Sequence, residues 1–211
     1  MLELHAIANK ILEVRHATRR GLSVLAAITG IDGAGKGYIT AQLVKILQAN
    51  DVRTVAVNID GWLNLPGRRF GPSNPAEHFY LHAFRFDEMF AQLVRPLRDR
   101  RSIRCEVAYA EETAVAYRRH VYQFDDIDVI LLEGIFLLKQ AFQSYYDLSC
   151  WIDCSFDTAL ERAIARGQEG LSPEDTTHAY RTIFFPAQEI HFQRDFPRAA
   201  ATVIFDNDMR A

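Results

Sequence analysis

A glycine-rich segment with a single lysine is the strongest chemical pattern in the sequence. It reads Gly30-Ile-Asp-Gly-Ala-Gly-Lys36 and satisfies the spacing G-x-x-x-x-G-K. Glycines at this spacing let successive backbone N–H groups curl around phosphate oxygens, and the helix N-terminus that follows adds partial positive charge. Lys36 would reach the β- and γ-phosphates of a nucleotide, whereas Asp32 is expected to hold the turn through its own backbone. The residues predicted to bind the nucleotide are Gly30, Asp32, Gly33, Ala34, Gly35, Lys36, Gly37 and Tyr38.

The residue after the lysine departs from the complete pattern. A Ser or Thr at this position normally holds Mg²⁺ through its hydroxyl, but the sequence has Gly37 there, and Thr40 lies too far along the helix to be a sound replacement. Three interpretations remain open. The metal relies on carboxylates, phosphates and water, or the metal binds weakly, or the chain binds a nucleotide without turning it over.

Two carboxylates at the ends of predicted strands are candidates for the remaining chemistry. Asp60 follows the apolar segment 54–59, and Glu133 ends the apolar segment 128–133. Ligands of open α/β sheets sit beyond the carboxyl ends of the strands. One carboxylate could orient Mg²⁺ while the other accepts the proton of an attacking hydroxyl, as phosphoryl transfer requires. Either could instead be a helix N-cap or a solvated strand end.

The predicted elements must bring these residues to one edge of a sheet. Short apolar segments predict strands at 22–29, 54–59, 128–133, 148–153 and 202–205, and helical spacing predicts helices at 2–20, 39–47, 86–97, 158–166 and 175–194. Residues 61–76 are rich in Gly and Pro and predict a long loop, and 103–122 could form a hairpin or ribbon. Strands that alternate with helices predict an α/β fold wound in parallel, with residues 1–211 in a single domain.

Composition excludes several classes of protein. Twenty-four Lys and Arg against 27 Asp and Glu give a net charge of −3, so we expect no nucleic-acid partner. No apolar segment approaches the ~18 residues of a membrane span, and residues 2–20 resemble an amphipathic helix rather than a secretory signal. Three cysteines do not make a disulfide framework, so a cytoplasmic location is expected. Cys150 and Cys154 have no histidine-rich partner nearby, which argues against a zinc site.

Four motifs occur in an order that is found in a known family. These are Gly30–Lys36, Asp60-Gly-Trp62, Glu133-Gly-Ile135 and the segment 157–166, which together span about residues 22–205. In this order the chain resembles the uridine kinases, in the branch of the P-loop kinases that includes phosphoribulokinase and bacterial pantothenate kinase. The resemblance implies a three-layer α/β/α fold with a parallel sheet of about five strands and a lid at about 162–175. It also implies ATP and Mg²⁺ as cofactors, and phosphorylation of a hydroxyl on a small molecule such as a nucleoside or a related metabolite.

The resemblance also assigns roles to charged residues. It implies that Asp60 is the catalytic base and that Arg162 and Arg166, in an R-x-x-x-R lid helix, contact the phosphates. Without it, two arginines spaced four residues apart could equally be a solvated helix face. The predicted catalytic residues are therefore Lys36, Asp60, Arg162 and Arg166, and the predicted metal ligands are Glu133 and Asp60.

The acceptor is less well specified than the donor. The Asp-His-Pro segment with which uridine kinases hold the ribose is missing, and the lid continues after Arg166 as Gly167-Gln-Glu-Gly170, without the family's further arginines. Both departures weaken uridine and cytidine as acceptors. The arginines of the loop 61–76 could read an anionic or planar acceptor, or they could simply be solvated. Tyr109 could stack on a ring or pack in the core. The residues predicted to contact the acceptor are Trp62, Arg68, Arg69, Tyr80, His82 and Tyr109.

Two other classes of function stay open at this point. The first is a non-catalytic nucleotide-binding or regulatory protein, which Gly37 suggests, and the second is an NTPase stimulated by a partner protein. The helix at 2–20 could pack on the sheet or form a contact between two copies of the chain, so a homo-oligomer is also open.

Overall fold

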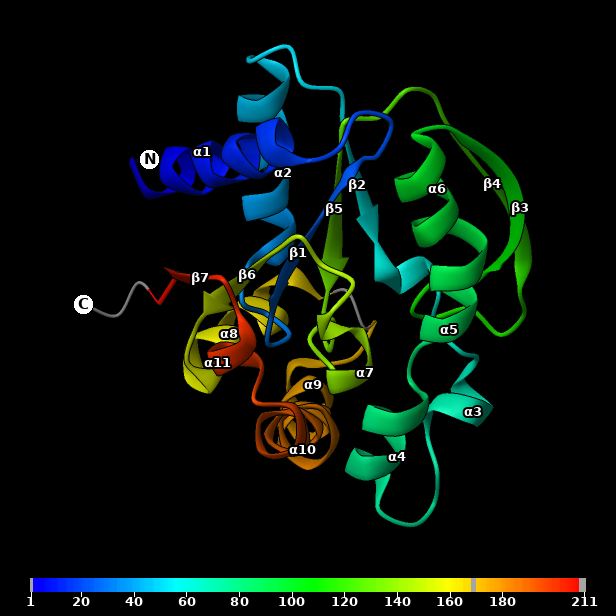
Figure 1. The fold of residues 1–211 in the computed structure, drawn as a ribbon. Coiled ribbons are helices and arrows are strands. Elements are labelled where there is room, and N and C mark those ends of the chain that lie inside the picture. The colour runs from blue at the N-terminus through cyan, green and yellow to red at the C-terminus, as the bar shows by residue number, and fades with distance from the viewer. Residues whose placement is uncertain (1, 168–169, 209–211) are drawn as a thin grey trace.

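A parallel five-stranded sheet forms the centre of the fold (Figure 1). The computed structural model describes residues 2–167 and 170–208. The strands follow the order β2-β5-β1-β6-β7, and all their pairings are parallel. Their bounds are β1 (Val24–Gly30), β2 (Thr54–Asn58), β5 (Val129–Gly134), β6 (Leu148–Asp153) and β7 (Val203–Asp206). The α/β class and the five parallel strands are confirmed.

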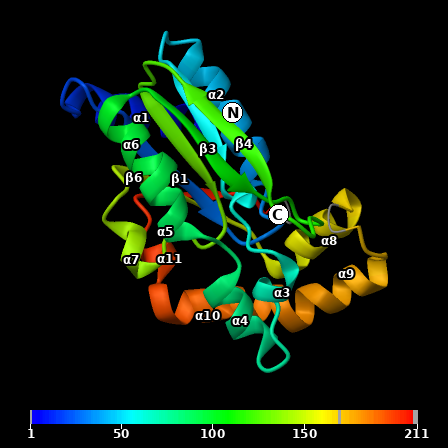
Figure 2. The same cartoon turned by 90° about the vertical axis from the view of Figure 1, so that its right-hand side faces the viewer.

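The three central strands are apolar because both of their faces are covered. β1 and β5 are buried along their whole length, and β6 is buried up to its last residue. Parallel sheets require such continuous apolar segments, because helices pack on both sides. α1 (Leu2–Ala17) and α2 (Lys36–Gln48) pack against each other and against β1. Figures 1 and 2 show helices on both sides of the sheet.

The helices differ from the predicted ranges mainly at their ends. α1 ends at Ala17, before the predicted end at residue 20, and α2 begins at Lys36, directly after the glycine-rich loop. The helix expected at 158–166 is α8 (Phe156–Arg166), which begins earlier because the Ser155 hydroxyl accepts a hydrogen bond from the Thr158 N–H. Three consecutive helical elements form the helix expected at 175–194: α9 (Pro173–Ala179), η3 (Tyr180–Phe184) and α10 (Phe185–Asp195). The short helix α11 (Pro197–Ala200) follows them.

The predicted loop at 61–76 is the largest difference from the sequence-based expectation. A single turn, η1 (Ile59–Gly61), follows β2, and the rest of the segment contains α3 (Pro66–Arg69) and the start of α4 (Pro75–His82). Two of the prolines that suggested a loop, Pro66 and Pro75, occupy the first helical position of α3 and α4, where the missing N–H costs nothing. The helix predicted at 86–97 is formed by α5 (Phe86–Met89), η2 (Phe90–Val94) and α6 (Arg95–Arg100). α7 (Gln140–Gln143) follows β5.

A separate two-stranded ribbon completes the fold. β3 (Ile103–Tyr109) and β4 (Arg118–Phe124) pair antiparallel, as the hairpin interpretation of residues 103–122 predicted. Figure 2 shows this ribbon in front of the central sheet. An isolated bridge joins Trp62 to Ala110, so the end of the ribbon lies beside the segment that follows β2.

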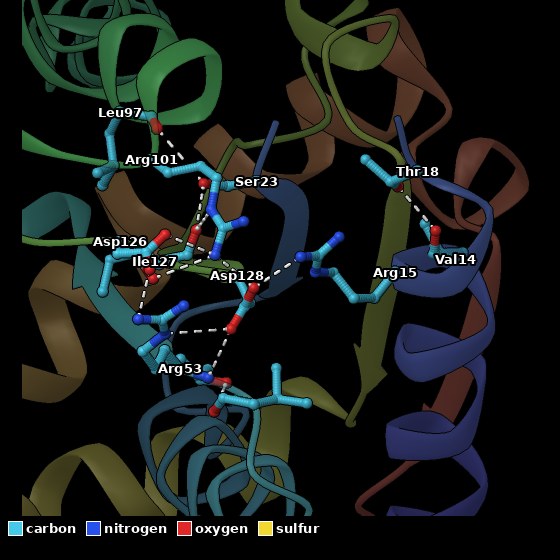
Figure 3. A network of polar contacts seen from close by, with 12 residues as sticks. Val14, Arg15, Thr18, Ser23, Arg53, Leu97, Arg101, Asp126, Ile127 and Asp128 are labelled. Carbon is cyan, nitrogen blue, oxygen red and sulfur yellow. Dashed lines mark hydrogen bonds and ion pairs between the residues drawn. The ribbon is translucent and has the colours of Figure 1, made fainter. Parts of the chain in front are cut away.

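An ionic network ties α1 to the amino ends of the strands (Figure 3). Asp128, just before β5, accepts hydrogen bonds from Arg15 on α1 and from Arg101 after α6, each at 2.7 Å. The backbone N–H of Arg53 also donates to it, at 3.1 Å. Burial opposes ionisation of Asp128, but these hydrogen bonds and the guanidinium charges outweigh it and lower the pKa of the carboxyl. The network therefore fixes the helix at the end of the sheet opposite to the glycine-rich loop.

Candidate active site

The glycine-rich loop connects β1 to α2 in a conformation that only glycine adopts easily. Gly33 and Gly35 have φ angles of 77° and 87°, and Gly35 is the N-cap of α2. A Cβ atom on Gly33 would lie 2.4 Å from the carbonyl oxygen of Ala159, so α8 packs directly against the loop. The side chain of Lys36 is buried and its Nζ donates to the carbonyl of Ile31 at 2.8 Å. The lysine charge is thus held at the loop itself.

Asp32 stabilises the loop and also links it to the helical region that follows α8. Its Oδ1 accepts a hydrogen bond from the backbone N–H of Gly33 at 2.8 Å, which is the local turn contact expected from the sequence. Its Oδ2 accepts a hydrogen bond from the Tyr180 hydroxyl at 2.7 Å. A guanidinium nitrogen of Arg166 lies 3.6 Å from Oδ1 and 3.3 Å from the Tyr180 oxygen.

A cavity of about 330 Å³, here called the loop cavity, lies at the carboxyl ends of β2 and β5. Asp60 and Glu133 both line it, together with Lys36 and the glycine-rich loop. The sheet register explains the meeting of the two carboxylates, because Asn58 at the end of β2 pairs with Glu133 in β5. The predicted nucleotide residues that line the cavity are Asp32, Gly33, Gly35, Lys36, Gly37 and Tyr38.

Asn58 is a site residue that the sequence analysis missed. Its Nδ2 donates to Glu133 Oε2 at 2.8 Å, and its Oδ1 accepts from the backbone N–H of Asp60 at 2.6 Å. One amide therefore fixes the relative position of both carboxylate-bearing segments. The available signal was a polar residue at the end of a predicted apolar strand, two positions before Asp60.

Burial and like charge raise the pKa values of both carboxylates. Desolvation is the largest cause for Glu133, the charge of Lys36 opposes it, and the charges of Asp60 and Asp32 add to it, so that the pKa of Glu133 rises to about 7. Desolvation and then the charge of Asp32 raise the pKa of Asp60. The charge of Lys36 lowers both pKa values but offsets only part of the rise. Three carboxylates gathered around one lysine form a site whose negative charge favours a bound cation.

The donor set fits a hard divalent cation. Carboxylate oxygens are the protein ligands that Mg²⁺ prefers, and it usually keeps several waters and binds substrate phosphates as well. Within residues 2–167 and 170–208, no group of three or more His, Cys, Asp or Glu has a geometry that could enclose a metal. A Mg²⁺ ion at Glu133 and Asp60 would therefore depend on phosphates and water for its other ligands. Gly37 contributes no hydroxyl, and a Cβ atom there would meet nothing within 4 Å.

The two arginines of α8 have different surroundings. Arg166 lines the loop cavity and is partly exposed. Arg162 is half-buried behind the loop, where its guanidinium donates to the carbonyl of Asn207 at 2.8 Å and to that of Ala34 at 3.4 Å. The Asn207 amide also donates to Ala34 O, at 2.7 Å. The structure therefore brings Arg166 into the cavity, whereas Arg162 braces the loop from outside.

Most residues expected to contact the acceptor lie away from the loop cavity. Trp62 is fully buried, with its ring stacked against Tyr122 at 6.2 Å. Arg69 is also buried, and it donates to the carboxylate and the carbonyl of Glu112. Tyr80 is in the core, where its hydroxyl donates to Asp195 at 2.6 Å. These three side chains are occupied by packing and by internal hydrogen bonds.

The remaining three predicted acceptor residues divide between two other cavities. Arg68 and His82 line a different cavity, which also includes Lys139. Tyr109 lines a cavity beside Asp60, at the end of the β3–β4 ribbon. Of the six residues, Tyr109 is thus the one that shares a cavity with Asp60.

The loop, the lysine and the paired carboxylates define a P-loop protein built for phosphate chemistry. The chain belongs to the phosphoribulokinase / uridine kinase family, whose model matches residues 25–183. A uridine kinase of Staphylococcus haemolyticus (strain JCSC1435) is 24% identical over 168 residues, which cover 78% of this chain and 79% of the relative. Membership of this family supports an ATP-dependent phosphotransferase.

Solved structures share the fold at low sequence identity. A protein of Bacillus stearothermophilus described as a possible uridine kinase superposes with a TM-score of 0.73 at 17% identity, covering 97% of this chain and 100% of that one. D-glycerate 3-kinase from Cryptococcus neoformans var. grubii superposes with a TM-score of 0.68 at 12% identity, covering 98% and 95%. The P-loop kinase fold is therefore shared by proteins with different acceptors.

None of the helices in the described part of the chain is both long and apolar enough to cross a bilayer. Cys150 is buried in β6 and Cys154 lies after it, and neither belongs to a metal-binding group among the described residues.

Proposed function

We propose that this chain transfers the γ-phosphoryl group of ATP to a hydroxyl group of a small molecule. The observation that carries this proposal is the presence of Asp60, Glu133 and Lys36 in one cavity with the glycine-rich loop. Family membership supports ATP as the donor. Uridine is one candidate acceptor, because the curated relatives are uridine kinases.

The donor is held by the loop and the acceptor hydroxyl is activated by Asp60. The backbone N–H groups at the start of α2 bind the phosphates, and Lys36 neutralises charge on the transferring group. Asp60 accepts the hydroxyl proton as the new O–P bond forms and the bond to the ADP oxygen breaks. The acceptor leaves as a phosphate ester, and the proton passes to solvent from Asp60.

Glu133 is the principal protein ligand proposed for Mg²⁺, with Asp60 beside it. The ion supplies charge neutralisation on the phosphates. Arg166 is proposed to leave Asp32 and contact the phosphates, which would shield the transfer from water. Arg162 is proposed to act indirectly, by keeping the carbonyl of Ala34, and so the loop, in place.

The test is ADP release from ATP and Mg²⁺ across a panel of nucleosides, vitamins and sugars, with a blank that lacks acceptor. Asp60→Asn is expected to lower acceptor-dependent turnover about 10²- to 10⁴-fold, the usual contribution of a general base, while ATP binding persists. Asp99→Asn is the matched control, since Asp99 is exposed on α6 and lines neither the loop cavity nor the cavity beside Tyr109. Near-normal turnover in Asp60→Asn would remove it as the base.

The same assay separates the rival functions. Gly37, which lacks the usual hydroxyl, favours a nucleotide-binding protein without turnover as the second candidate. ATP binding with no acceptor-dependent ADP release would support that candidate. ATP hydrolysis that needs no small acceptor and is stimulated by a protein partner would support an NTPase instead.

A further inference from the structure

A second cavity, here called the ribbon cavity, opens beside Asp60. It has a volume of about 440 Å³ and lies at the end of the β3–β4 ribbon. Asn58, Asp60 and Glu112 line both this cavity and the loop cavity. A molecule in the ribbon cavity can therefore present a hydroxyl to Asp60 while the loop holds the donor, which makes this the place for the acceptor.

The side chains that face the ribbon cavity are rich in hydrogen-bond acceptors. They include the carboxylates of Asp60, Glu111 and Glu112 and the hydroxyl of Thr113. No Lys or Arg is among the described residues that line it. Ionised carboxylates accept hydrogen bonds and donate none, so the wall matches a ligand that offers several O–H donors.

Two of the carboxylates in this lining already form ion pairs with arginines. Arg69 is buried and lies 3.1 Å from the carboxylate of Glu112. Arg118 lies 2.7 Å from the carboxylate of Glu111. Each cation lies outside the lining of the ribbon cavity, so an anionic ligand would meet carboxylate oxygens first and would have to displace an existing ion pair to reach an arginine. The two ion pairs also neutralise the charges of Glu111 and Glu112, which a cationic ligand would otherwise meet.

The aromatic ring in the wall is not available for stacking on a base. The guanidinium of Arg118 lies over the ring of Tyr109, 4.4 Å from its centroid. The imidazole of His120 lies 4.7 Å from the same centroid. A Cβ atom on Gly61 would come within 2.3 Å of the ring, so Gly61 packs against it closely. Tyr109 therefore acts as a wall rather than as a platform for a nucleobase.

From this lining we infer that the acceptor is a neutral polyhydroxylated molecule, such as a sugar or polyol, rather than a phosphate ester, an acid or an amine. The inference rests on the proposed kinase function and narrows its substrate class. It replaces the expectation that Arg68 and Arg69 read an anionic acceptor, because Arg68 faces another cavity and Arg69 is buried against Glu112.

The test compares neutral and charged acceptors with related carbon skeletons, using the full chain with ATP and Mg²⁺. The sets are glycerol, glycerate and glycerol 3-phosphate; ribose, ribonate and ribose 5-phosphate; and glucose with glucosamine. We expect kcat/KM for the neutral member to exceed that of each charged member at least tenfold. A comparison of uridine with ribose shows whether a base raises kcat/KM, and we expect that it does not.

A variant at the wall links this preference to the cavity. Glu111→Gln frees Arg118 beside the ribbon cavity, so the neutral-to-anionic ratio should fall about threefold or more. Glu106→Gln is the matched control, since Glu106 forms a similar exposed ion pair with Arg119, at 3.2 Å, and does not line the cavity. A structural effect alone would change all members of a set together and leave the ratio unchanged.

The outcomes separate the two proposals. A preference for an anionic or an amino acceptor, a large gain from the base, or a ratio that Glu111→Gln leaves unchanged would overturn the inference while the kinase stands. No acceptor-dependent ADP release from any set, with ATP still bound, would overturn the proposed function and the inference with it.

Discussion

The ionised side chain of Glu133 is expected to destabilise the folded protein when no ligand is bound. The residue is 8% exposed and lines the loop cavity together with Asp60, and burial is the largest cause that raises its pKa from 4.5 to about 7. In the unfolded chain the same carboxylate ionises with an ordinary pKa. Glu133→Gln keeps the size of the side chain, and its amide oxygen can still accept the hydrogen bond from Asn58. The substitution removes the charge and replaces one carboxylate oxygen with an amide NH₂ group.

The size of the effect follows from the pKa difference. One pKa unit corresponds to about 1.4 kcal/mol, so ionised Glu133 costs the native state about 3 kcal/mol. Between the two pKa values the native state binds one proton more than the unfolded state, and stability therefore falls as the pH rises through this window. Glu133→Gln should raise the free energy of unfolding by about 3 kcal/mol near pH 8 and by less than about 1 kcal/mol near pH 5.

Urea unfolding at both pH values, in EDTA and without nucleotide, measures this difference. The control Glu106→Gln lies at an exposed position on the ribbon. Its free energy of unfolding should stay within about 0.5 kcal/mol of that of the parent at both pH values. A second measurement in Mg²⁺ and ATP should show the parent gaining more stability than Glu133→Gln, since ligand binding stabilises the native state. A variant that is less stable than the parent near pH 8 in EDTA would refute the reasoning.

Two further substitutions test the ionic network and the loop. Asp128→Asn should lower the free energy of unfolding by about 2–4 kcal/mol, because it leaves the Arg15 guanidinium without its carboxylate. Asp126→Asn, at a carboxylate 47% exposed, should cost less than about 1 kcal/mol in the same urea titration, and equal losses would contradict this account. Gly37→Ser should fold normally and tighten ATP binding about threefold or more in Mg²⁺ but not in EDTA, because a Cβ atom meets nothing there and the hydroxyl restores a metal ligand. Gly67→Ser, at an equally open position on α3, should leave ATP binding by calorimetry unchanged, and an equal gain in EDTA would argue against a metal role.

The strands and the loop were predictable because local chemistry specifies them. A parallel strand buried on both faces must be an apolar segment, and β1 and β5 are such segments. The glycine-rich loop depends on backbone conformations that its own residues decide. Asp60 and Glu133 could be placed together because the carboxyl ends of parallel strands meet at one edge.

The acceptor side was harder to predict because it depends on contacts between distant residues. Arg69 carries a charge that usually lies at the surface, yet it is buried because Glu112, 43 positions away, pairs with it. Trp62 follows Asp60 by two residues, and nothing local reveals that its ring turns into the core against Tyr122. Asn207 reaches Ala34 across 173 positions. Such pairings exist only after the sheet has formed.

β5 begins directly after Asp128 and carries Glu133 as its next-to-last residue, so one strand separates the ionic network from the candidate active site. Five residue steps along a strand span about 17 Å, and two unit charges at that separation interact by about 1 kcal/mol at an effective dielectric constant of about 20. Substitutions in the network should therefore change the electrostatics of the loop cavity less than substitutions in the cavity itself. The ionic network and the candidate active site thus lie at opposite ends of one buried strand, and each can be altered without rebuilding the other.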